Sequence, residues 1–596
     1  MSEASLTAPA RLRRPAGSPL RRALIIGLVF GVVAVYIAVV GILPLIDARW
    51  IIVNVVSLGG AALIAIGMGA GAVVATRRSS SELWSVVGRC LLAGAIAGGM
   101  LALLAAAMKA LDLRPIFIAL SPALFKTLTF GLGLPLGGAI LVLGGALLAV
   151  AGGALSLAPA GIRRPVLIGL SCVVIFGVFQ ELIQITMQYG AVVGALREAI
   201  YTWEGLSPEG ALAIFLVSCG AALAWTNFLR TPARKAFDRL SPAQQDRVKA
   251  ARIVLFVLIL IALPIVAGSY IGQVMMLVGL YILMGMGLNL EVGLAGLLDL
   301  GFVAFFAVGA YTTAILTADS PYALASYTSV PSLSYWAAMP IAVIASIVVG
   351  VLFGVPVLGI RGDYLAVATM GLGEIVRVIV QSDMAAPILG GAQGILQIPK
   401  PKIGGFELAD PVELFYLTLA ASAVAAYFAW RLENSRLGRA WMALRDDEDV
   451  AQALGINLVK VKLLAYGLGA AFAGLAGSIF AVMLTSIYPS SFQLLISINV
   501  LALIIVGGMG SLPGVVVGAT ALIGLPELLR EFGEFRFLFY GAALILMMRF
   551  KPEGLWPSAV RRRELRAAAE EADAEAPEEA AAFVDQPQPA AQQTAQ

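Results

Sequence analysis

The chain has 596 residues, of which 60% are hydrophobic and 13% are charged, and its formal net charge is +4. A soluble domain carries about 25% charged and about 45–50% apolar residues, so this many apolar side chains cannot be hidden inside a globule. A membrane-crossing helix needs about 20 mostly apolar residues, and such stretches recur from Ala23 to Phe550. The composition therefore predicts an all-α, polytopic membrane protein with about 16 membrane-spanning segments. Lys and Arg fall in short loops, where they orient helices in the bilayer rather than bind nucleic acid.

Several kinds of chemistry are excluded by what the sequence lacks. Without histidine, the chain has no imidazole acid–base catalysis and no His-ligated metal site. Its cysteines stand singly within apolar stretches, where packing is the expected role, so we expect no bound metal. The sequence contains no Gly-Lys dipeptide and hence no G-x-x-x-x-G-K-[ST] phosphate loop. We expect a protein that is no enzyme and binds no cofactor itself, so that any ATP is bound by another chain.

The first part of the chain is predicted to be a separate helical bundle. Residues 1–22 are basic and are placed in the cytoplasm, and residues 23–229 form a six-helix membrane extension. Basic loops return to one side after each pair of helices, as the positive-inside rule requires. The predicted crossings are Ala23–Leu45, Ile52–Ala75, Val86–Met108, Leu132–Ala154, Val166–Tyr189 and Gly210–Leu229.

A polar segment, residues 230–252, is predicted to be a cytoplasmic linker to the main bundle, residues 253–555. The last crossings of that bundle are short and are interrupted by glycines, from Gly507 to Gly510. Such breaks persist in lipid only where protein or water satisfies the backbone. Residues 556–596 are predicted to be a disordered cytoplasmic tail. The predicted crossings of the main bundle are Ile253–Ser269, Ile271–Asn289, Gly301–Thr317, Ala337–Leu358, Leu365–Val380, Leu414–Trp430, Leu463–Leu484, Leu494–Ile505, Pro513–Leu525 and Phe535–Met548.

The hydrophilic loop from 431 to 462 is the most informative segment. By the count of crossings it is cytoplasmic, and helical spacing predicts one amphipathic helix from Trp441 to Leu454 that Gly455 ends. Leu444 and Leu454 are expected on its apolar face, beside an acidic cluster that starts at Asp446. Such a helix fits a groove on a soluble partner. The alternative is a solvated connector that stays near the bilayer.

Four blocks of sequence, in this order, resemble the permeases of branched-chain amino acid ABC importers. They cover about half of the chain, from Ile271 to Leu555, and the resemblance is closer to the M-type of the two paralogous permeases. The blocks are Gly287–Gly301 with Ala304–Tyr311, Arg361–Arg377, Ser435–Trp441 with Ala453–Asn457 and Lys460–Ala465, and Gly507–Gly514.

The resemblance implies an ATP-driven importer in the bacterial inner membrane. Its expected partners are a second permease, two ATPase subunits and a periplasmic substrate-binding protein, besides the lipid bilayer. The six N-terminal helices have no counterpart in the family pattern, so the resemblance gives them no role. The residues that it assigns to ATPase coupling are Arg439, Asp446, Asp447, Glu448 and Gly455, to which the apolar Leu444 and Leu454 are added as the buried centre of the contact.

Candidates for the translocation pathway come from polar and glycine positions in the core. Glu374 and Arg377 lie three residues apart on one predicted helix and can neutralise each other, either as a polar lining of the pathway or as a clamp between helices. Both are expected to face the interior of the bundle. The family block Gly-Gly-x-Asn-Gly occurs as Gly390 to Gly394, with glutamine where asparagine is common. The remaining candidates are Asn289, Gly391, Gln393 and Gly394.

Two alternatives to the branched-chain amino acid importer stay open at this stage. One is an ABC permease for urea, short amides or other amino acids. The other is a secondary transporter driven by ions, a class that has inverted repeats and carboxylates at the membrane midplane. The sequence shows no matching helix break in its N-terminal half.

Overall fold

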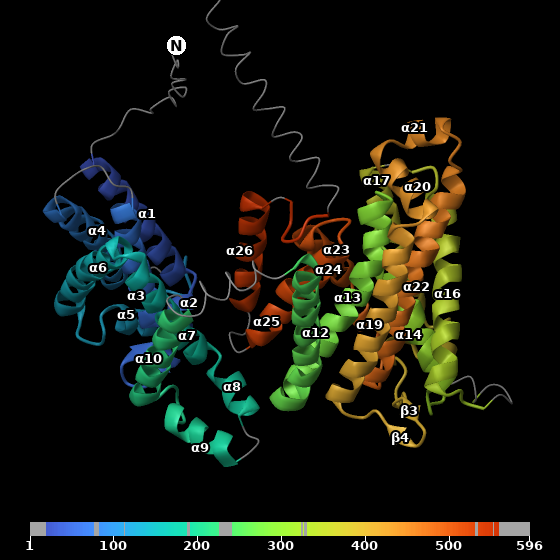
Figure 1. The fold of residues 1–596 in the computed structure, drawn as a ribbon, viewed down its shortest axis with the longest axis horizontal. Helices are drawn as coiled ribbons and strands as arrows, with labels where there is room; N and C mark the ends of the chain where they lie inside the picture. The colour runs from blue at the N-terminus through green and yellow to red at the C-terminus, as the bar shows by residue number, and fades with distance from the viewer. Residues whose placement is uncertain are drawn as a thin grey trace, which may run out of the picture. The chain divides into compact units, whose positions relative to one another are not determined.

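The computed structural model describes residues 19–76, 83–111, 114–187, 191–225, 241–322, 326, 331–360, 362–530, 535–551 and 553–558. The chain divides into two compact units, residues 1–256 and 257–596. Both are built from helices, and their only described strands form two antiparallel hairpins, β1–β2 and β3–β4 (Figure 1). The predicted all-α membrane class is confirmed.

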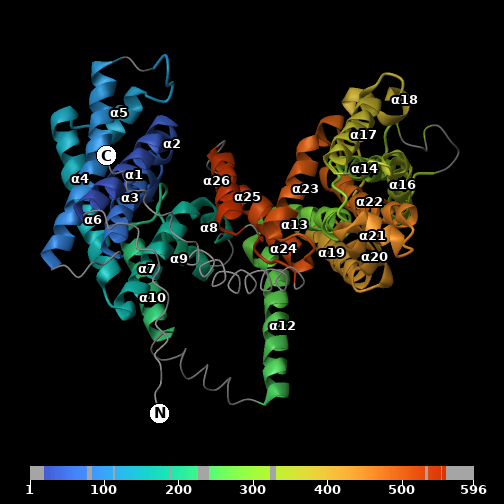
Figure 2. The same ribbon diagram turned by 90° about the horizontal axis from the view of Figure 1, so that it is seen from above.

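Unit 1 is a bundle in which α1, α3, α4 and α6 pack side by side, as both ribbon views show (Figures 1 and 2). At one end of the bundle, the carboxylate of Asp47 accepts hydrogen bonds from Ser57 and Thr127 and joins α2, β2 and the α5 region. The elements are α1 Pro19–Val39, α2 Ile42–Asp47, β1 Trp50–Ile52, β2 Val56–Ser57, α3 Leu58–Thr76, α4 Leu83–Ala110, α5 Pro122–Leu128, α6 Leu134–Leu157, α7 Ala160–Val178, α8 Gln180–Thr186, α9 Ala191–Ile200 and α10 Pro208–Ala224.

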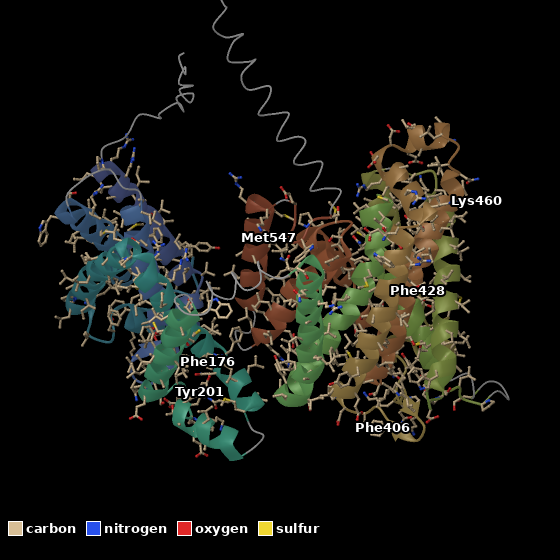
Figure 3. The ribbon with its side chains drawn as sticks, in the orientation of Figure 1. Phe176, Tyr201, Phe406, Phe428, Lys460 and Met547 are labelled. Atoms are coloured by element: carbon tan, nitrogen blue, oxygen red, sulfur yellow. The ribbon has the colours of Figure 1, made fainter. Side chains whose placement is uncertain are left out.

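Polar contacts also close the second half of unit 1. The Tyr201 hydroxyl donates to the carbonyl oxygen of Phe176, 3.1 Å away, and Figure 3 shows the two residues near each other. Burial raises the pKa of the Tyr201 hydroxyl, because the ionised form would lose its hydration. This tyrosine therefore stays neutral and acts as a hydrogen-bond donor that ties the segment after α9 to α7.

Helix α12, Pro242–Ala267, crosses the boundary between the units without a break. The side chains of Ser241 and Gln244 form a reciprocal cap at its start, with N–H to oxygen distances of 3.1 and 3.4 Å. Residues 242–252 of the predicted linker 230–252 belong to this helix. That the segment is cytoplasmic and links two membrane bundles stays a prediction. Residues 230–240 and the predicted tail beyond Ser558 lie outside the described residues.

Unit 2 is organised around α22, the most buried of the long apolar helices. It packs against α13, α14 and α16 (Figures 1 and 2). The elements are α13 Ser269–Leu288, the π-helical η2 Asn289–Leu294, α14 Val303–Thr317, α16 Tyr335–Val357, α17 Asp363–Gln381, α18 Ala386–Leu389, η3 Gly391–Gln393, β3 Lys402–Ile403, β4 Phe406–Glu407, α19 Pro411–Glu433, α20 Arg436–Asp446, α21 Glu448–Ala453, α22 Leu458–Leu484, η4 Pro489–Ser491, α23 Leu494–Gly507, α24 Leu512–Ala519, the π-helical η5 Thr520–Gly524, α25 Leu525–Leu528 and α26 Phe535–Phe550.

Length and composition identify candidate membrane crossings among the described helices. In the described part of the chain, 11 helices are long and apolar enough to cross a membrane. The other predicted segments coincide with shorter apolar helices, such as α10 and α14. The count of about 16 is therefore not confirmed, although each predicted segment overlaps a described helix.

Glycine contacts bring the helix backbones of unit 2 close together. A Cβ atom on Gly309 of α14 would lie 2.3 Å from the carbonyl oxygen of Gly474 on α22. One on Gly477 would lie 2.1 Å from the carbonyl oxygen of Phe306. In lipid, where burial of apolar surface does not drive helices together, such close packing supplies much of their attraction.

The helix break predicted at Gly507–Gly510 is present, and neighbouring protein satisfies the backbone there. Gly508 has a φ of +122°, a conformation that side chains other than glycine rarely adopt. The backbone N–H groups of Leu555 and Trp556 donate to the carbonyl oxygens of Val506 and Gly507, each at 2.8 Å. Gly507, Gly508 and Gly510 are buried, as expected for a break inside the bundle, whereas Met509 is 51% exposed.

The α14–α22 contact gives a stability prediction. Gly309→Ala should lower the free energy of unfolding by about 1–3 kcal/mol, because its new methyl group must push α14 away from α22. The control is Gly371→Ala on α17, where a Cβ meets nothing within 4 Å and the higher helix propensity of alanine adds about 1 kcal/mol of stability. Thermal unfolding of the purified chain in detergent checks both. Equal melting temperatures would contradict the close contact.

Candidate functional site

The loop between α19 and α22 forms two short helices instead of the single predicted one. Helix α20 ends at Asp446, and Asp447 adopts an extended backbone before α21 begins. The carboxylate of Asp447 accepts hydrogen bonds from the N–H groups of Asp449 and Val450, both at 2.9 Å, and so caps α21. Gly455, at φ +88°, ends α21 as predicted. The prediction of one continuous helix from Trp441 to Leu454 is wrong, because a local cap competes with the helix.

The inner face of α20 is already occupied by the chain itself. The side chain of Trp441 is fully buried, and its indole N–H donates to the carbonyl oxygen of Val461 at 2.9 Å. Leu444 is 5% exposed and belongs to the hydrophobic core of unit 2. This burial contradicts the expectation that Leu444 forms the centre of a contact with a partner. Leu454, by contrast, is 76% exposed.

A buried ion pair holds α21 against α22. The Lys462 ammonium lies 2.6 Å from a carboxylate oxygen of Glu448 and also donates to the carbonyl oxygen of Leu358 at 3.2 Å. The side chain of Lys462 is 4% exposed and that of Glu448 is 21% exposed. Glu448, expected to contact a partner, thus has its main described contact within this chain.

The outer face of the loop is exposed and carries both charge and apolar surface. Arg439, Asp446 and Asp447 are exposed. Beside them lie the apolar side chains of Val450 and Leu454. We call this exposed set, with Gly455, the coupling face.

Arg445 connects the loop to the interior of unit 2. Its guanidinium donates to the carbonyl oxygen of Gly293 in η2, at 2.8 Å, and its aliphatic stem covers Gly296. In the same segment, the side-chain oxygen of Asn289 accepts a hydrogen bond from the N–H of Gly510, also at 2.8 Å. Hydrogen bonds thus join α20 to η2, and η2 to the break between α23 and α24.

Asn289 is a sequence candidate for the translocation pathway, and this role stays a prediction. Its side chain is buried, 1% exposed, and is used to hold the glycine break. It shares no described contact with the other pathway candidates.

Glu374 and Arg377 form the predicted pair on α17, with the guanidinium donating to the carboxylate. Their side chains are 48% and 31% exposed, so they face away from the interior of this unit, and the expected inward orientation is wrong. The two opposite charges neutralise each other on the surface of the helix. Arg377, Val376 and Tyr311 line a groove between α17, α14 and η4.

The Gly390–Gly394 block lies at the end of α17 and packs on the segment after α22. Gly390, Gly391 and Gly394 all have positive φ, and a Cβ on Gly394 would lie 1.9 Å from the carbonyl oxygen of Ile487. Ile395 and Ile487 exchange two backbone hydrogen bonds at 2.9 and 3.0 Å. Gln393 is exposed. The block thus follows the C-terminal end of the helix that carries the Glu374–Arg377 pair.

The coupling face and the β3–β4 hairpin, which follows the Gly390–Gly394 block, lie at opposite ends of unit 2. Figure 3 shows this through Lys460, near α21, and Phe406, in β4. Near the hairpin, Lys400 donates to the carbonyl oxygen of Met483 at 3.2 Å. Partial burial lowers the pKa of Lys400, and the nearby Glu407 partly opposes this.

The sequence alone did not single out four side chains with specific contacts: Arg445, Lys462, Glu291 and Asp299. The basic pair looked like ordinary loop charge. The two acids could have been noticed, since they are charged residues in an otherwise apolar stretch, Gly287–Gly301.

Comparison with known proteins agrees with this geometry. The family model described as the permease component of the branched-chain amino acid transport system matches residues 270–548. The high-affinity branched-chain amino acid transport system permease protein LivM of Salmonella typhimurium is 36% identical over 368 residues, which are 56% of this chain and 84% of the relative. LivM of Escherichia coli is 36% identical over 377 residues, 55% of this chain and 84% of the relative. The chain belongs to this permease family.

A weaker likeness extends to a second type of permease in the family. The permease protein LivH of Salmonella typhimurium is 28% identical over 176 residues, 29% of this chain and 55% of that protein. This permease is therefore a multi-pass inner-membrane protein of a paired permease system. No solved structure matches the chain.

The buried ion pair makes a prediction for the coupling loop of the permease. Lys462→Ala should destabilise α21 by about 1–3 kcal/mol, since Glu448 loses its partner but keeps some access to water. Hydrogen exchange at the amides of residues 448–453 should become faster. The control is Lys460→Ala on the exposed side of α22, expected to change stability by less than about 0.5 kcal/mol. Unchanged exchange in Lys462→Ala would show that the pair does not hold the helix.

Proposed function

We propose that this permease is the membrane subunit of an ATP-driven importer that moves branched-chain amino acids across the bacterial inner membrane. The names of the LivM relatives support the substrate class. The observation that carries the mechanism is the loop of α20 and α21. Its inner face is fixed to the permease core, while its outer face exposes charged and apolar side chains at one end of unit 2.

ATP binding and hydrolysis are assigned to two partner ATPase subunits, one of which docks on the coupling face. The exposed Leu454 and Val450 would supply the buried centre of that contact. The acids Asp446 and Asp447 would guide docking through complementary charge. A push on α20 would then reach η2 through the bond of Arg445 to Gly293. The connector alternative leaves these exposed apolar side chains without a role.

The exposed side of α17 is assigned to the second permease and the pathway between the two. Charges in the membrane are costly, about 2.5–3.5 kcal/mol each when placed at the centre of a helix in lipid. The outward-facing pair of Glu374 and Arg377 is therefore better placed against protein or a water-filled path than against lipid. The Gly390–Gly394 block, at the end of the same helix, would border the entrance, where a periplasmic binding protein delivers the substrate.

An ion-driven transporter is the alternative from another class. Such a protein would need a charged ion-binding site that is open to the pathway, and it would not need a soluble ATPase subunit. The anchored but outward-exposed coupling face favours ATP-driven transport, because an ion-driven protein has no use for it.

The docking assignment predicts the effect of one exposed leucine. Leu454→Asp should reduce both ATPase co-purification and leucine uptake at least about tenfold, since a carboxylate would be buried at the contact. The matched control is Leu396→Asp, an equal change at an exposed leucine on the segment after η3. Co-purification should be normal in the control. Wild-type co-purification of Leu454→Asp would remove the assigned docking contact. Leu444→Asp does not serve as a test, because it would place a charge in the core.

Substrate and energy source are tested together by uptake into proteoliposomes that contain the whole complex. Labelled leucine should accumulate when ATP is enclosed with the ATPase subunits and should not respond to a proton or sodium gradient. Labelled urea and lysine should enter no faster than without the permease. Accumulation that follows an ion gradient in the absence of ATP would favour the alternative.

A further inference from the structure

Two carboxyl groups lie in the core of unit 2, in and just after η2. Glu291 is 0% exposed and Asp299 is 1% exposed. Both oxygens of Glu291 and one oxygen of Asp299 have no hydrogen-bond donor among the described residues. The other oxygen of Asp299 accepts from the N–H of Gly301 at 2.7 Å. The two carboxyl groups interact electrostatically with each other.

No described cation neutralises this pair. Of the basic side chains on the elements that pack against η2, Lys462 is bonded to Glu448, and Arg445 to the carbonyl oxygen of Gly293. The hydroxyl of Tyr466, on α22, is the other titratable group near both carboxyls, and it has no described partner. Two adjacent carboxylates that are buried without a neutralising cation do not both stay ionised, because burial disfavours each charge and each repels the other.

We propose that Glu291 and Asp299 form a buried proton-binding site in which one proton is held between the two carboxyl groups. Glu291 carries the proton and donates a hydrogen bond to the carboxylate of Asp299. The assignment follows from the contacts: Asp299 is stabilised as an anion by the N–H of Gly301 and lies within reach of the Thr369 hydroxyl. Glu291 has no donor to stabilise a negative charge among the described residues.

A proton fits this site better than a metal ion does. A Cβ atom on Gly469 of α22 would lie only 1.8 Å from a carboxylate oxygen of Glu291, so the carboxyl group fills the space that a side chain would occupy there. Hard cations need several oxygen ligands, about 6–8 for Ca²⁺. The described residues contain no group of three or more acidic or cysteine side chains that could hold a metal. A shared proton needs no added volume.

The proton-bearing bond joins η2 to the segment that leads into α14. The same η2 segment receives Arg445 from the coupling loop and holds Gly510 through Asn289. The pair therefore fixes the position of the segment through which movement of the loop reaches the core. This consequence rests on the proposed function, whereas the protonation itself does not.

Infrared spectroscopy of the full chain in lipid nanodiscs tests the protonation directly. At pH 7 the wild-type chain should show the C=O stretching band of a protonated carboxylic acid, shifted to lower frequency in D₂O. Glu291→Gln should remove the band. Glu374→Gln is the control, because that exposed acid is ionised beside Arg377 and its loss should leave the band unchanged. No such band in the wild type, or its persistence in Glu291→Gln, overturns the proposal.

Transport separates a neutral from a charged Glu291. The amide of Glu291→Gln is neutral and can still donate to Asp299, so leucine uptake should stay within about twofold of wild type. A larger loss in a variant with wild-type melting temperature and elution would mean that the negative charge is needed, which overturns the assignment. If the wild-type complex imports no leucine, the proposed function fails while the infrared result still decides the proton site.

Discussion

The permease core depends on one constraint, which is that backbone groups freed by a helix break inside a membrane must find partners in the protein. The break after Val506 is closed by the backbone of Leu555 and Trp556. The side-chain oxygen of Asn289 in η2 also contacts this break, where it accepts a hydrogen bond from the N–H of Gly510. At the start of α14, the N–H of Val303 donates to the hydroxyl of Ser497 on α23 at 2.9 Å. Because these partners come from distant parts of the chain, η2, α14 and α23 are fixed to one another.

This constraint also explains what the sequence could predict. Apolar runs long enough to cross a bilayer determine the helices, and every predicted crossing overlaps a described helix. Successive glycines within an apolar segment are enough to indicate the break. Gly455 marks the end of α21, since a left-handed position there favours glycine. These are local properties, and each can be seen in the residues themselves.

The positions that were predicted wrongly depend on tertiary partners. Leu444 and Leu454 look alike in sequence, yet one packs into the core and the other is exposed, because Asp447 ends α20 and turns the chain between them. The orientation of Glu374 depends on which side of α17 meets this unit. The sequence shows that Glu291 is an acid within an apolar run. It does not show that Asp299 lies beside it, or that the absence of a side chain at Gly469 makes room for its carboxyl group, because both depend on the fold.

The closure of the α23 break by Leu555 and Trp556 has a consequence for how the protein is made. Chains emerge from the ribosome from the N-terminus, at about 5–20 residues per second. Helix α23 is therefore synthesised before the residues that complete its backbone. Until Leu555 and Trp556 have been added, the carbonyl groups of Val506 and Gly507 lack these donors. A chain that stops before residue 555 therefore cannot close the break, however well its earlier helices pack.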